Sequence, residues 1–392
     1  MKIRDMAQAA LPGMIDTRRY LHMHPEVSFH EEQTYRYILE RLQKYPDLKV
    51  REGVGEGGIL ATLGNGGDPH IAIRADFDAL PIHDEKDVPY RSTVDGVMHA
   101  CGHDAHTSTL LALLDLLYEN RHAIKGSVSF IFQFAEEIQP GGAVAMVGDG
   151  ALDGIDRVYG QHYWSQYPTH TIKTRPGPII SSPDMFKIKI KGRGGHAAHP
   201  SQAVDPVVIA AELITSLQTA VSRQISPLDN AVVTVGKIHA GDAFNVIPDT
   251  AELIGTVRTF EQSIKERIQD IFQKEVDHTA RKRGATAELE YNIGYPAVVN
   301  HNREADIIEE AAAAMGLEFE TAKPMMIGED FSYYINEVPG AFFFTGSGNA
   351  AKQSDYVHHH PMFDLDEEAM TSGLSMFMKI LEIEQVIEWK QE

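Results

Sequence analysis

Hydrophobic residues in the first half of the chain follow two patterns, helical spacing and short unbroken runs. Between Glu31 and Tyr45 they recur every three or four positions, which predicts an amphipathic helix that ends near Pro46. Unbroken apolar runs are typical of strands that are buried on both faces. Because such strands alternate with helices here, the pattern predicts an α/β domain with a sheet flanked by helices. The further elements expected in this half are strands at 58–63, 70–74, 126–137 and 157–160 and a helix at 106–120.

The pattern changes after Asp184, where apolar and polar residues alternate strictly. Phe186, Ile188 and Ile190 alternate with three lysines, which predicts a strand with only one buried face. The elements that follow, up to Gly294, have the order β-α-β-β-α-β of a ferredoxin-like α+β domain. The elements expected there are helices at 203–223 and 262–282 and strands at 231–238, 251–259 and 286–291.

The last hundred residues return to the first pattern, with a helix at 302–315, a strand at 341–345 and a helix at 366–387. A chain of 392 residues is also longer than one hydrophobic core usually supports. We therefore predict a discontinuous α/β domain with an open mixed sheet at 1–182 and 295–392. A ferredoxin-like domain at 183–294 is inserted between its halves.

Composition and charge exclude several classes of function. The net charge of -21 argues against nucleic acid or an anionic membrane as the main partner. No apolar run reaches the ~20 residues of a membrane span. The N-terminal stretch is interrupted by Asp5, Gln8 and Pro12 before it could form the apolar part of a signal peptide, and a single cysteine suits a reducing compartment. These features predict a cytoplasmic location.

Acidic residues and histidines follow three of the predicted strands. Asp76 and Asp78 follow the second strand, Glu136 and Glu137 end the third, and His162 follows the fourth. In open α/β sheets the ligand site lies beyond the carboxyl ends of the strands. One polar strand end would mean little, but three of them predict a site at this edge.

The stretch MHACGHDAH carries the only cysteine, Cys101, with His99, His103 and His106 close to it. Thiolate and imidazole are ligands that borderline-soft divalent ions prefer, and Gly102 permits a tight turn between Cys101 and His103. Taken alone, a buried thiol with incidental histidines would be the better interpretation. The acidic strand ends favour a metal site instead. For the other histidine pair, His22 and His24, the sequence favours structural hydrogen bonds over metal binding.

Eight motifs in order along the chain resemble the aminoacylase and carboxypeptidase G family of dinuclear metallohydrolases. Within that family the resemblance is to the branch of hippurate hydrolases, N-acyl-amino-acid amidohydrolases and auxin-conjugate hydrolases. It implies metal-dependent hydrolysis of the amide bond of N-acyl or N-aroyl amino acids or dipeptide-like substrates. The motifs are RADFDALP, HACGHDAH, FQFAEE, GQH, GRGGHAAHP, NVIPDTAELIGTVRTF, GEDFSYY and HHPMFD.

The resemblance also implies roles for individual residues. Two divalent ions, of zinc, manganese, nickel or cobalt, are expected on five ligands: Cys101, His103, Glu137, His162 and His359. His360 is the competing choice for the last of them. Glu136 matches the general base and Asp78 an aspartate that orients a metal-binding neighbour. Adjacent side chains of an extended segment point to opposite sides, so one glutamate of the pair can bind metal while the other moves a proton.

In the inserted domain, His196 follows two glycines and resembles the family's lid histidine, which stabilises the oxyanion; His199 is the competing choice. Asn245 and Arg258 match groups that hold the substrate carboxylate, for which the planar fork of arginine is suited. The resemblance further implies a homodimer formed through the inserted domain, with His196 reaching the partner's active site.

Two other functions remain open from the sequence. A two-metal phosphoesterase would use similar ligands, but it would want more basic residues than the candidate loops contain. A non-catalytic amino-acid or peptide binder could keep the same fold, but it would need neither Glu136 nor His196. The leading prediction is the amidohydrolase.

Overall fold

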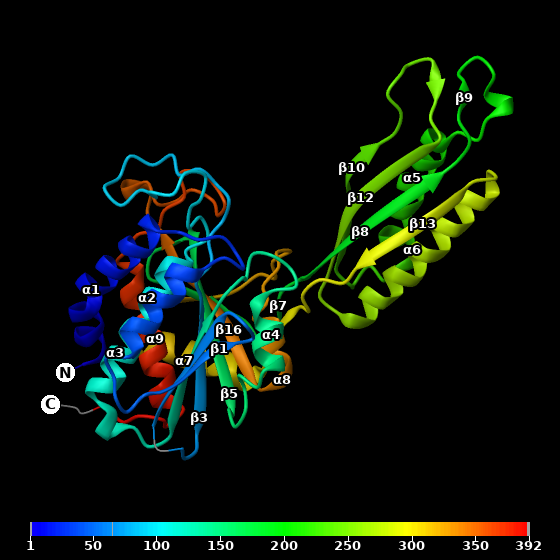
Figure 1. Cartoon of the computed structure of the whole chain (residues 1–392). Helices are drawn as coiled ribbons and strands as arrows, with labels where there is room; N and C mark the ends of the chain where they lie inside the picture. Colours follow the sequence, from blue (N-terminus) through cyan, green and yellow to red (C-terminus); the bar gives the residue numbers. More distant parts are fainter. Residues whose placement is uncertain (1, 65, 390–392) are drawn as a thin grey trace. The chain divides into compact units, whose positions relative to one another are not determined.

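The structure is a computed structural model that describes residues 2–64 and 66–389, and it divides into two compact units (Figure 1). Unit 1 contains Met1–Ile179, Val299–Lys323 and Asp330–Glu392, and unit 2 contains Ile180–Val298 and Pro324–Glu329. The breaks at 179/180 and 298/299 lie within four residues of the expected boundaries, whereas 324–329, expected in the α/β domain, belongs to unit 2. The short segment 324–329 joins unit 2 through Met325, whose carbonyl accepts a hydrogen bond from the Ser181 amide at 3.0 Å.

Unit 1 is built on an eight-stranded mixed sheet of order β1-β2-β4-β3-β5-β16-β6-β15, which confirms the predicted α/β class. The four central strands β4, β3, β5 and β16 are parallel, and β2 and β6 pair antiparallel at their two sides. The bounds are β1 Lys49–Val54, β2 Gly58–Gly64, β3 His70–Asp76, β4 Ser127–Gln133, β5 Arg157–Pro168, β6 Thr171–Thr174, β15 Glu318–Thr321 and β16 Gly340–Gly348.

Helices cover both faces of this sheet (Figure 1). Helices α1, α3 and α9 pack on one another, and α7 packs on α9, whereas α2 contacts β2 and α4 contacts α8 and β4. The bounds are α1 Ile3–Met23, α2 Glu32–Leu42, α3 His103–Glu119, α4 Gly142–Gly148, α7 Asn302–Ala314, α8 Ser332–Glu337 and α9 Ala369–Ile383. Between these helix layers, the parallel strands of the sheet all end at one edge of unit 1.

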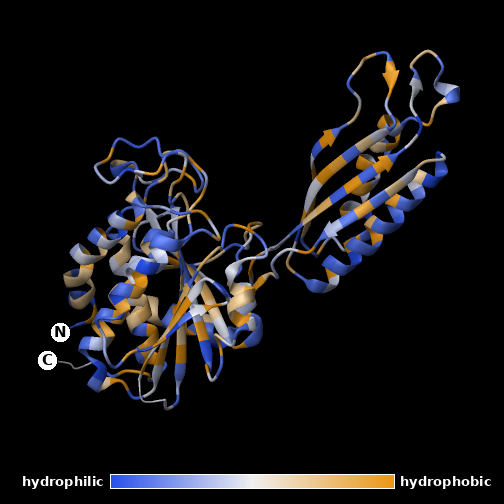
Figure 2. Cartoon of the chain, in the orientation of Figure 1, coloured by the Kyte–Doolittle hydropathy of each residue, from blue (hydrophilic) through white to orange (hydrophobic). Residues whose placement is uncertain are grey.

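The unbroken apolar runs form the centre of the core. In β3, β4 and β16, side chains such as Ile73, Phe130 and Phe343 are fully buried, because helices lie on both faces. Figure 2 shows these strands in hydrophobic colours and the outer turns of the helices in hydrophilic ones. In the part of the chain that the structure describes, no helix is long and apolar enough to cross a membrane.

Several elements differ from the sequence predictions. Helix α1 was not predicted, and it runs through Pro12 because its Met6, Leu11 and Met14 are buried against the core. Burial here outweighs the helix-breaking effect of proline. The strand expected at 157–160 continues to Pro168, the helix expected at 106–120 begins at His103, and the last helix is shorter than predicted.

Unit 2 has the predicted β-α-β-β-α-β order, with four antiparallel strands in the order β10-β12-β8-β13. The alternation that begins at Phe186 places Phe186, Ile188 and Ile190 in a core with residues of both helices, among them Leu213 and Phe272. The bounds are β8 Ser182–Lys191, α5 Pro206–Gln224, β10 Ala231–His239, β12 Thr250–Thr259, α6 Gln262–Lys282 and β13 Thr286–Asn292.

Two short strand pairs complete the fold. Strands β9 (Gly195–His196) and β11 (Val246–Ile247) pair beyond one end of the unit 2 sheet. Strands β7 (Gly177–Ile180) and β14 (Val298–Asn300) pair where the chain passes between the units. The first pair contains His196, and Asn245 lies directly before its second strand.

Candidate metal centre

The parallel strands bring the acidic strand ends and His162 to one level of the sheet. Asp76, the last residue of β3, is in register with Gln133 at the end of β4, and Glu136 and Glu137 follow shortly after. Arg74 is in register with Gly160 on β5, so His162 lies level with Asp76. The expectation that His162 follows a strand end was wrong, because β5 continues past it. We call this set of residues, together with Cys101–His106 and His359, the metal edge.

Two loops complete the metal edge. Gly102 has a φ of 93°, in the left-handed region that favours glycine, and α3 begins at the next residue, His103. The Cys-Gly-His turn is thus the start of a helix. His359 also has a positive φ, of 64°, and its amide donates a hydrogen bond to the Ala100 carbonyl at 2.8 Å. This bond joins the two loops directly, although they are far apart in the sequence.

The five predicted metal ligands converge at this edge. Cys101 Sγ lies 3.3 Å from His162 Nε2, and His359 Nε2 lies 3.4 Å from Glu137 Oε1. His103 Nε2 lies 3.9 Å from the same carboxylate oxygen. Cys101, His103 and His162 form one group with ligand atoms within 4.8 Å of one another, and Cys101, Glu137 and His359 form another. Because Cys101 belongs to both groups, the arrangement offers two adjacent ion positions.

Hydrogen bonds orient the histidine ligands. His103 donates from Nδ1 to Asp78 Oδ1 at 2.9 Å, and His162 donates from Nδ1 to the Tyr163 carbonyl at 2.7 Å. Each Nε2 is therefore left for another partner. Among the described residues, the buried atoms His103 Nε2 and Glu137 Oε1 have no hydrogen-bond partner. Buried polar atoms without partners are costly, so the donor set fits divalent ions that would coordinate them.

The charged groups at the metal edge also favour a bound divalent cation. Burial, followed by the carboxylates of Glu137 and Glu136, raises the pKa of the Cys101 thiol well above its usual value. Burial opposes ionisation of Asp78, but the hydrogen bond and charge of His103 outweigh it and lower the pKa of Asp78. Burial also opposes protonation of His103, yet Asp76 and then Asp78 raise its pKa to about 10. A divalent cation would relieve the repulsion between the crowded acidic groups.

Glu136, the predicted general base, is buried beside the ligands. Only 7% of its surface is exposed, and its carboxylate belongs with His103 and Glu137 to a group whose polar atoms lie within 4.8 Å of one another. The structure therefore places Glu136 within reach of a molecule bound at the metals.

Three other histidines around the candidate ligands have hydrogen-bond partners, although His106 also forms a possible metal-binding group with Asp76 and His103. His106 contacts Asp76 Oδ1 through Nδ1 at 2.6 Å and accepts a hydrogen bond from the Tyr163 amide at Nε2, so both its nitrogens are used. His358 donates to the Tyr163 carbonyl at 3.0 Å, and His360 accepts from the Met362 amide. Of the run 358–360, only His359 joins a metal-binding group within the described residues.

The structural interpretation of the other histidine pair is confirmed. His22 contacts Asp104 and Asp84 at 2.7 and 3.2 Å, and His24 donates to the Tyr20 carbonyl. His99 is buried without a hydrogen-bond partner among the described residues and belongs to no metal-binding group found among them.

Two supporting residues were missed from the sequence. Ser28 donates from its hydroxyl to Asp78 Oδ2 at 2.7 Å, which fixes the carboxylate that holds His103. Asp330 accepts from Arg74 at 2.8 Å and from the Ala143 amide at 3.0 Å, and so it fixes the loop that carries Glu136. Asp330 lies in the motif GEDFSYY and Ser28 lies shortly after His24, but neither stretch showed which strand end its side chain would support.

In unit 2 the structure brings together the predicted lid histidine, His196, and one of the two predicted substrate-binding residues, Asn245. His196 on β9 pairs with Val246, and the Ala197 amide donates to the Asn245 carbonyl at 3.1 Å. Both side chains are exposed at what we call the tip, residues 195–199 and 244–247. His199 lies there too, with its ring 5.6 Å from that of His196.

Arg258 lies at the other end of the unit 2 sheet. On β12 it faces Pro183, whereas Thr250, the residue nearest the tip, faces Lys191. Arg258 lies eight positions beyond Thr250 along the extended strand, a length of about 27 Å. Arg258 and the tip of the same chain are therefore too far apart to hold one small molecule.

Comparison with known proteins places the chain among hydrolases. It is 40% identical over 375 residues to the N-acetylcysteine deacetylase of Bacillus subtilis, covering 94% of this chain and 95% of that protein. It is 39% identical over 301 residues to the N-acyl-L-amino acid amidohydrolase of Geobacillus stearothermophilus, covering 77% and 81%. A solved dinuclear metal-binding peptidase of the M20 family from Bacillus subtilis has 35% identity and a TM-score of 0.83, covering 97% and 100%. Residues 72–383 match Peptidase family M20/M25/M40, and the chain belongs to that family.

Proposed function

We propose that this protein hydrolyses the amide bond of N-acyl amino acids at a two-metal centre formed by Cys101, His103, Glu137, His162 and His359. The observation that carries the proposal is a pair of buried atoms, His103 Nε2 and Glu137 Oε1, which have no hydrogen-bond partner among the described residues and lie 3.9 Å apart within the metal edge. Relatives named as a deacetylase and as an N-acyl-L-amino acid amidohydrolase support the substrate class.

Two bound divalent ions would lower the pKa of a water and polarise the substrate carbonyl. Thiolate, imidazole and carboxylate together suit zinc, manganese, nickel or cobalt, and we infer no single one of them. The role of Asp78 is to hold the His103 ring in one orientation, with Ser28 holding Asp78 in turn. Removing either contact would loosen a ligand without removing it.

Glu136 would carry the proton. It lies beside the ligands on the segment after β4 but is not needed to complete either three-residue group that shares Cys101. Its carboxylate would accept a proton from the attacking water and deliver it to the leaving amine nitrogen. Such proton transfer contributes about a hundredfold to ten-thousandfold in rate.

The substrate carboxylate and the oxyanion would be held by residues of unit 2. We propose that Asn245 and His196 at the tip, and Arg258, take these roles in a homodimer formed through unit 2. The separation of about 27 Å between Arg258 and the tip along one strand supports this arrangement, because one substrate could contact both only if they came from different chains. Unit 1 would then bind the metals, and unit 2 would hold the substrate. The single cysteine favours a cytoplasmic location for the protein.

The alternatives have less support. A phosphoesterase would share the metals, but relatives named for amide hydrolysis favour the amide bond. A non-catalytic binder would have no use for a buried carboxylate at the position of Glu136. A decision among the three functions requires a direct assay.

The assay uses the purified protein with added manganese or zinc. We expect release of the free amino acid from N-acetyl amino acids or from hippurate, and no release of phosphate from a phosphate ester. Glu136→Gln should lower kcat at least about a hundredfold while the metal content stays unchanged, because the amide keeps the shape of the side chain but accepts no proton.

Glu137→Gln is the matched control and should instead lose metal. If Glu137→Gln kept its metal and Glu136→Gln lost it, the two roles would be reversed. If no N-acyl amino acid were cleaved by the metal-loaded protein, the proposed function would be wrong.

A further inference from the structure

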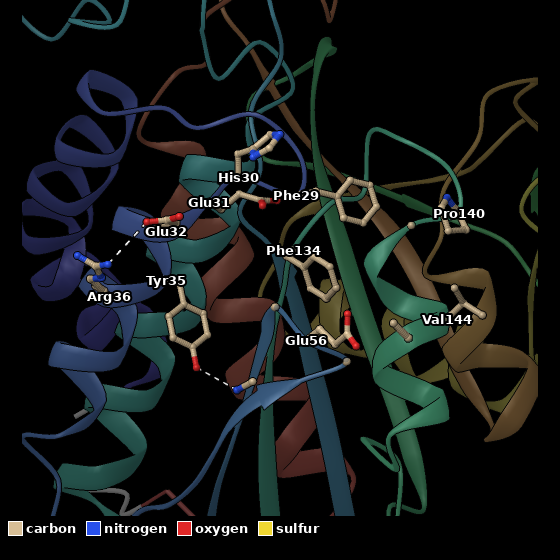
Figure 3. A pocket seen from close by; sticks show the side chains of 15 residues that line it. Phe29, His30, Glu31, Glu32, Tyr35, Arg36, Glu56, Phe134, Pro140 and Val144 are labelled. Carbon is tan, nitrogen blue, oxygen red and sulfur yellow. Dashed lines mark hydrogen bonds and ion pairs between the residues drawn. The ribbon is translucent and has the colours of Figure 1, made fainter.

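A cavity of about 680 Å³ opens in unit 1 between α2 and α4, over the turn that joins β1 and β2 (Figure 3). Three aromatic residues, Phe29, Tyr35 and Phe134, contribute to its lining. None of the candidate metal ligands, and not Glu136, is among the described residues that line it. The cavity is therefore separate from the metal edge, and the proposed metal chemistry does not account for it.

The aromatic residues are held in place around this space. The rings of Phe29 and Phe134 meet edge to face with centroids 5.8 Å apart. The Tyr35 hydroxyl accepts a hydrogen bond from the Gly53 amide at 2.9 Å, which fixes its ring. Phe29 is 46% exposed and has a φ of 67°, a conformation that costs energy for any residue but glycine. An exposed aromatic side chain on a strained backbone is typical of a binding surface.

The charged groups around the cavity are mainly acidic. Glu31, Glu32 and Glu56 line it, and the guanidinium of Arg36 is paired with Glu32 at 3.7 Å. Neither Glu31 nor Glu56 forms an ion pair with any residue between 2 and 64 or between 66 and 389. Figure 3 shows the Glu56 carboxylate on the same side of the cavity as the Phe134 ring. Aromatic rings and carboxylates both attract cations, and together they disfavour anions.

We propose that this cavity binds a small organic ammonium compound, with its apolar part against the rings of Phe29 and Phe134 and its charged nitrogen toward Glu31 and Glu56. The buried Glu31 supports the choice of charge. Burial, with the nearby Asp78 charge, raises the pKa of Glu31 to about 8, so a cation beside it would restore the ionised form. The rim also carries Val144, a partly exposed apolar residue on α4 that suits the apolar part of the ligand.

A ligand in this cavity would contact a segment that also supports the metal edge. Phe29 and Glu31 line the cavity, while Ser28 beside them donates to Asp78 at 2.7 Å. Glu31 itself accepts a hydrogen bond from the Ala135 amide at 2.8 Å, and Ala135 precedes Glu136. The segment 28–31 thus touches the cavity, the orienting aspartate and the residue before the general base.

The test measures binding of benzyltrimethylammonium to the metal-loaded full-length protein by calorimetry. This probe carries a fixed positive charge and no lone pair, so it cannot coordinate a metal. We expect a dissociation constant below about 1 mM, and binding of benzenesulfonate at least about tenfold weaker. Equal binding of the anion, or no binding of the cation at millimolar concentration, overturns the proposal.

Variants locate the site. Val144→Trp places an indole in the cavity and should weaken binding of the cation at least about tenfold. Val207→Trp on α5 is the matched control, since Val207 is 41% exposed against 37% for Val144 and lies outside the cavity; its binding should stay within about twofold. Unchanged binding by Val144→Trp overturns the proposal.

A second pair of variants covers the case in which Val144→Trp does not fold. Glu56→Gln removes one charge at the cavity, and Glu52→Gln removes an exposed charge nearby on β1 that does not line it. We expect several-fold weaker binding for Glu56→Gln and none of this loss for Glu52→Gln. Equal losses, or no loss in either variant, would mean that the charge of the cavity does not select the ligand.

Discussion

At the metal edge of unit 1 the candidate ligands Cys101, His103 and His162 are almost fully buried and are held by hydrogen bonds to buried neighbours. At the tip of unit 2, by contrast, His196 and Asn245 are exposed, and the neighbouring Phe244 is fully exposed. The first region is organised before any substrate binds. The printed strand register and the Ala197–Asn245 bond of the second region are contacts of the backbone, so its exposed side chains are free to meet another molecule.

The burial of the metal edge comes with a network of charges behind it. The guanidinium of Arg18 is fully buried and contacts Asp104, next to His103, at 2.9 Å, and Asp364, shortly after His359, at 2.6 Å. Arg18 therefore ties α1 to both loops of the metal edge. The tip has no comparable set of buried ion pairs among the described residues. Variants at the tip and at the metal edge can test this difference.

The largest effect is expected at the tip. His196→Ala and Glu136→Ala should each lower activity at least about a hundredfold. If His196 completes the partner's site, co-refolding the two variants makes hybrid dimers with one intact site of two, and activity should recover to roughly a quarter of wild type. Assay of the mixture, with hybrids isolated by two different tags, measures this. No recovery in isolated hybrids would mean that His196 serves its own chain or has no role.

Removal of Arg18 should have the next largest effect. Arg18→Met leaves Asp104 and Asp364 buried without their cation, at an expected cost of about 3–5 kcal/mol in the free energy of unfolding. Arg19→Met is the matched control, because Arg19 is 42% exposed and pairs with Glu367, and its loss should stay below about 1 kcal/mol. Urea unfolding of both variants measures the difference. If both variants lost the same free energy of unfolding, the buried ion pairs of Arg18 would stabilise the protein no more than an exposed ion pair does.

Cys101→Ser tests whether the thiol is a ligand shared by two ions. A serine hydroxyl stays protonated where a thiolate would bind, so metal affinity should fall at least about tenfold. Metal analysis after gel filtration, with the wild type treated in parallel, measures the content per chain. A variant that retained two equivalents with unchanged affinity would exclude Cys101 as a ligand and remove the centre of the metal edge.

The smallest effect concerns pH. Because the pKa of Glu31 is raised to about 8 in the folded protein, the folded state holds a proton that the unfolded state releases. The stability that comes from this proton is complete below the unfolded pKa of about 4.5 and is lost as the pH rises through about 8. The slope is at most about 1.4 kcal/mol per pH unit.

Glu31→Gln should remove this slope. Thermal unfolding of the metal-free wild type and variant between pH 5 and 9 measures it. A wild-type slope that persisted in the variant would have to come from other groups.

The sequence allowed much of the metal edge to be predicted because its chemistry is local. Cys101, His103 and the Glu136–Glu137 pair lie in short motifs, and the sheet order places β4, β3 and β5 side by side, which brings the acidic strand ends level with His162. The supporting contacts could not be predicted in the same way. Arg18 and Asp364 are 346 positions apart, and nothing in either neighbourhood indicates the other.

The helix that carries Arg18 was missed as well, because the local pattern gives weight to Pro12 and not to the core that buries the helix. The residues of unit 2 show a different limit. Motif order suggests that His196, Asn245 and Arg258 act together, and only the strand register shows that Arg258 lies at the opposite end of the sheet from the other two.

The position of β16 has a consequence for how the chain folds during synthesis. This strand lies between β5 and β6 in the sheet of unit 1, yet it follows the whole of residues 180–298 in the sequence. As the chain leaves the ribosome, β5 must wait for its central neighbour while nearly all of unit 2 is already available to fold. The inserted unit can therefore form before its host, and residues of unit 1 such as His162 gain their final surroundings only when the last quarter of the protein has been made.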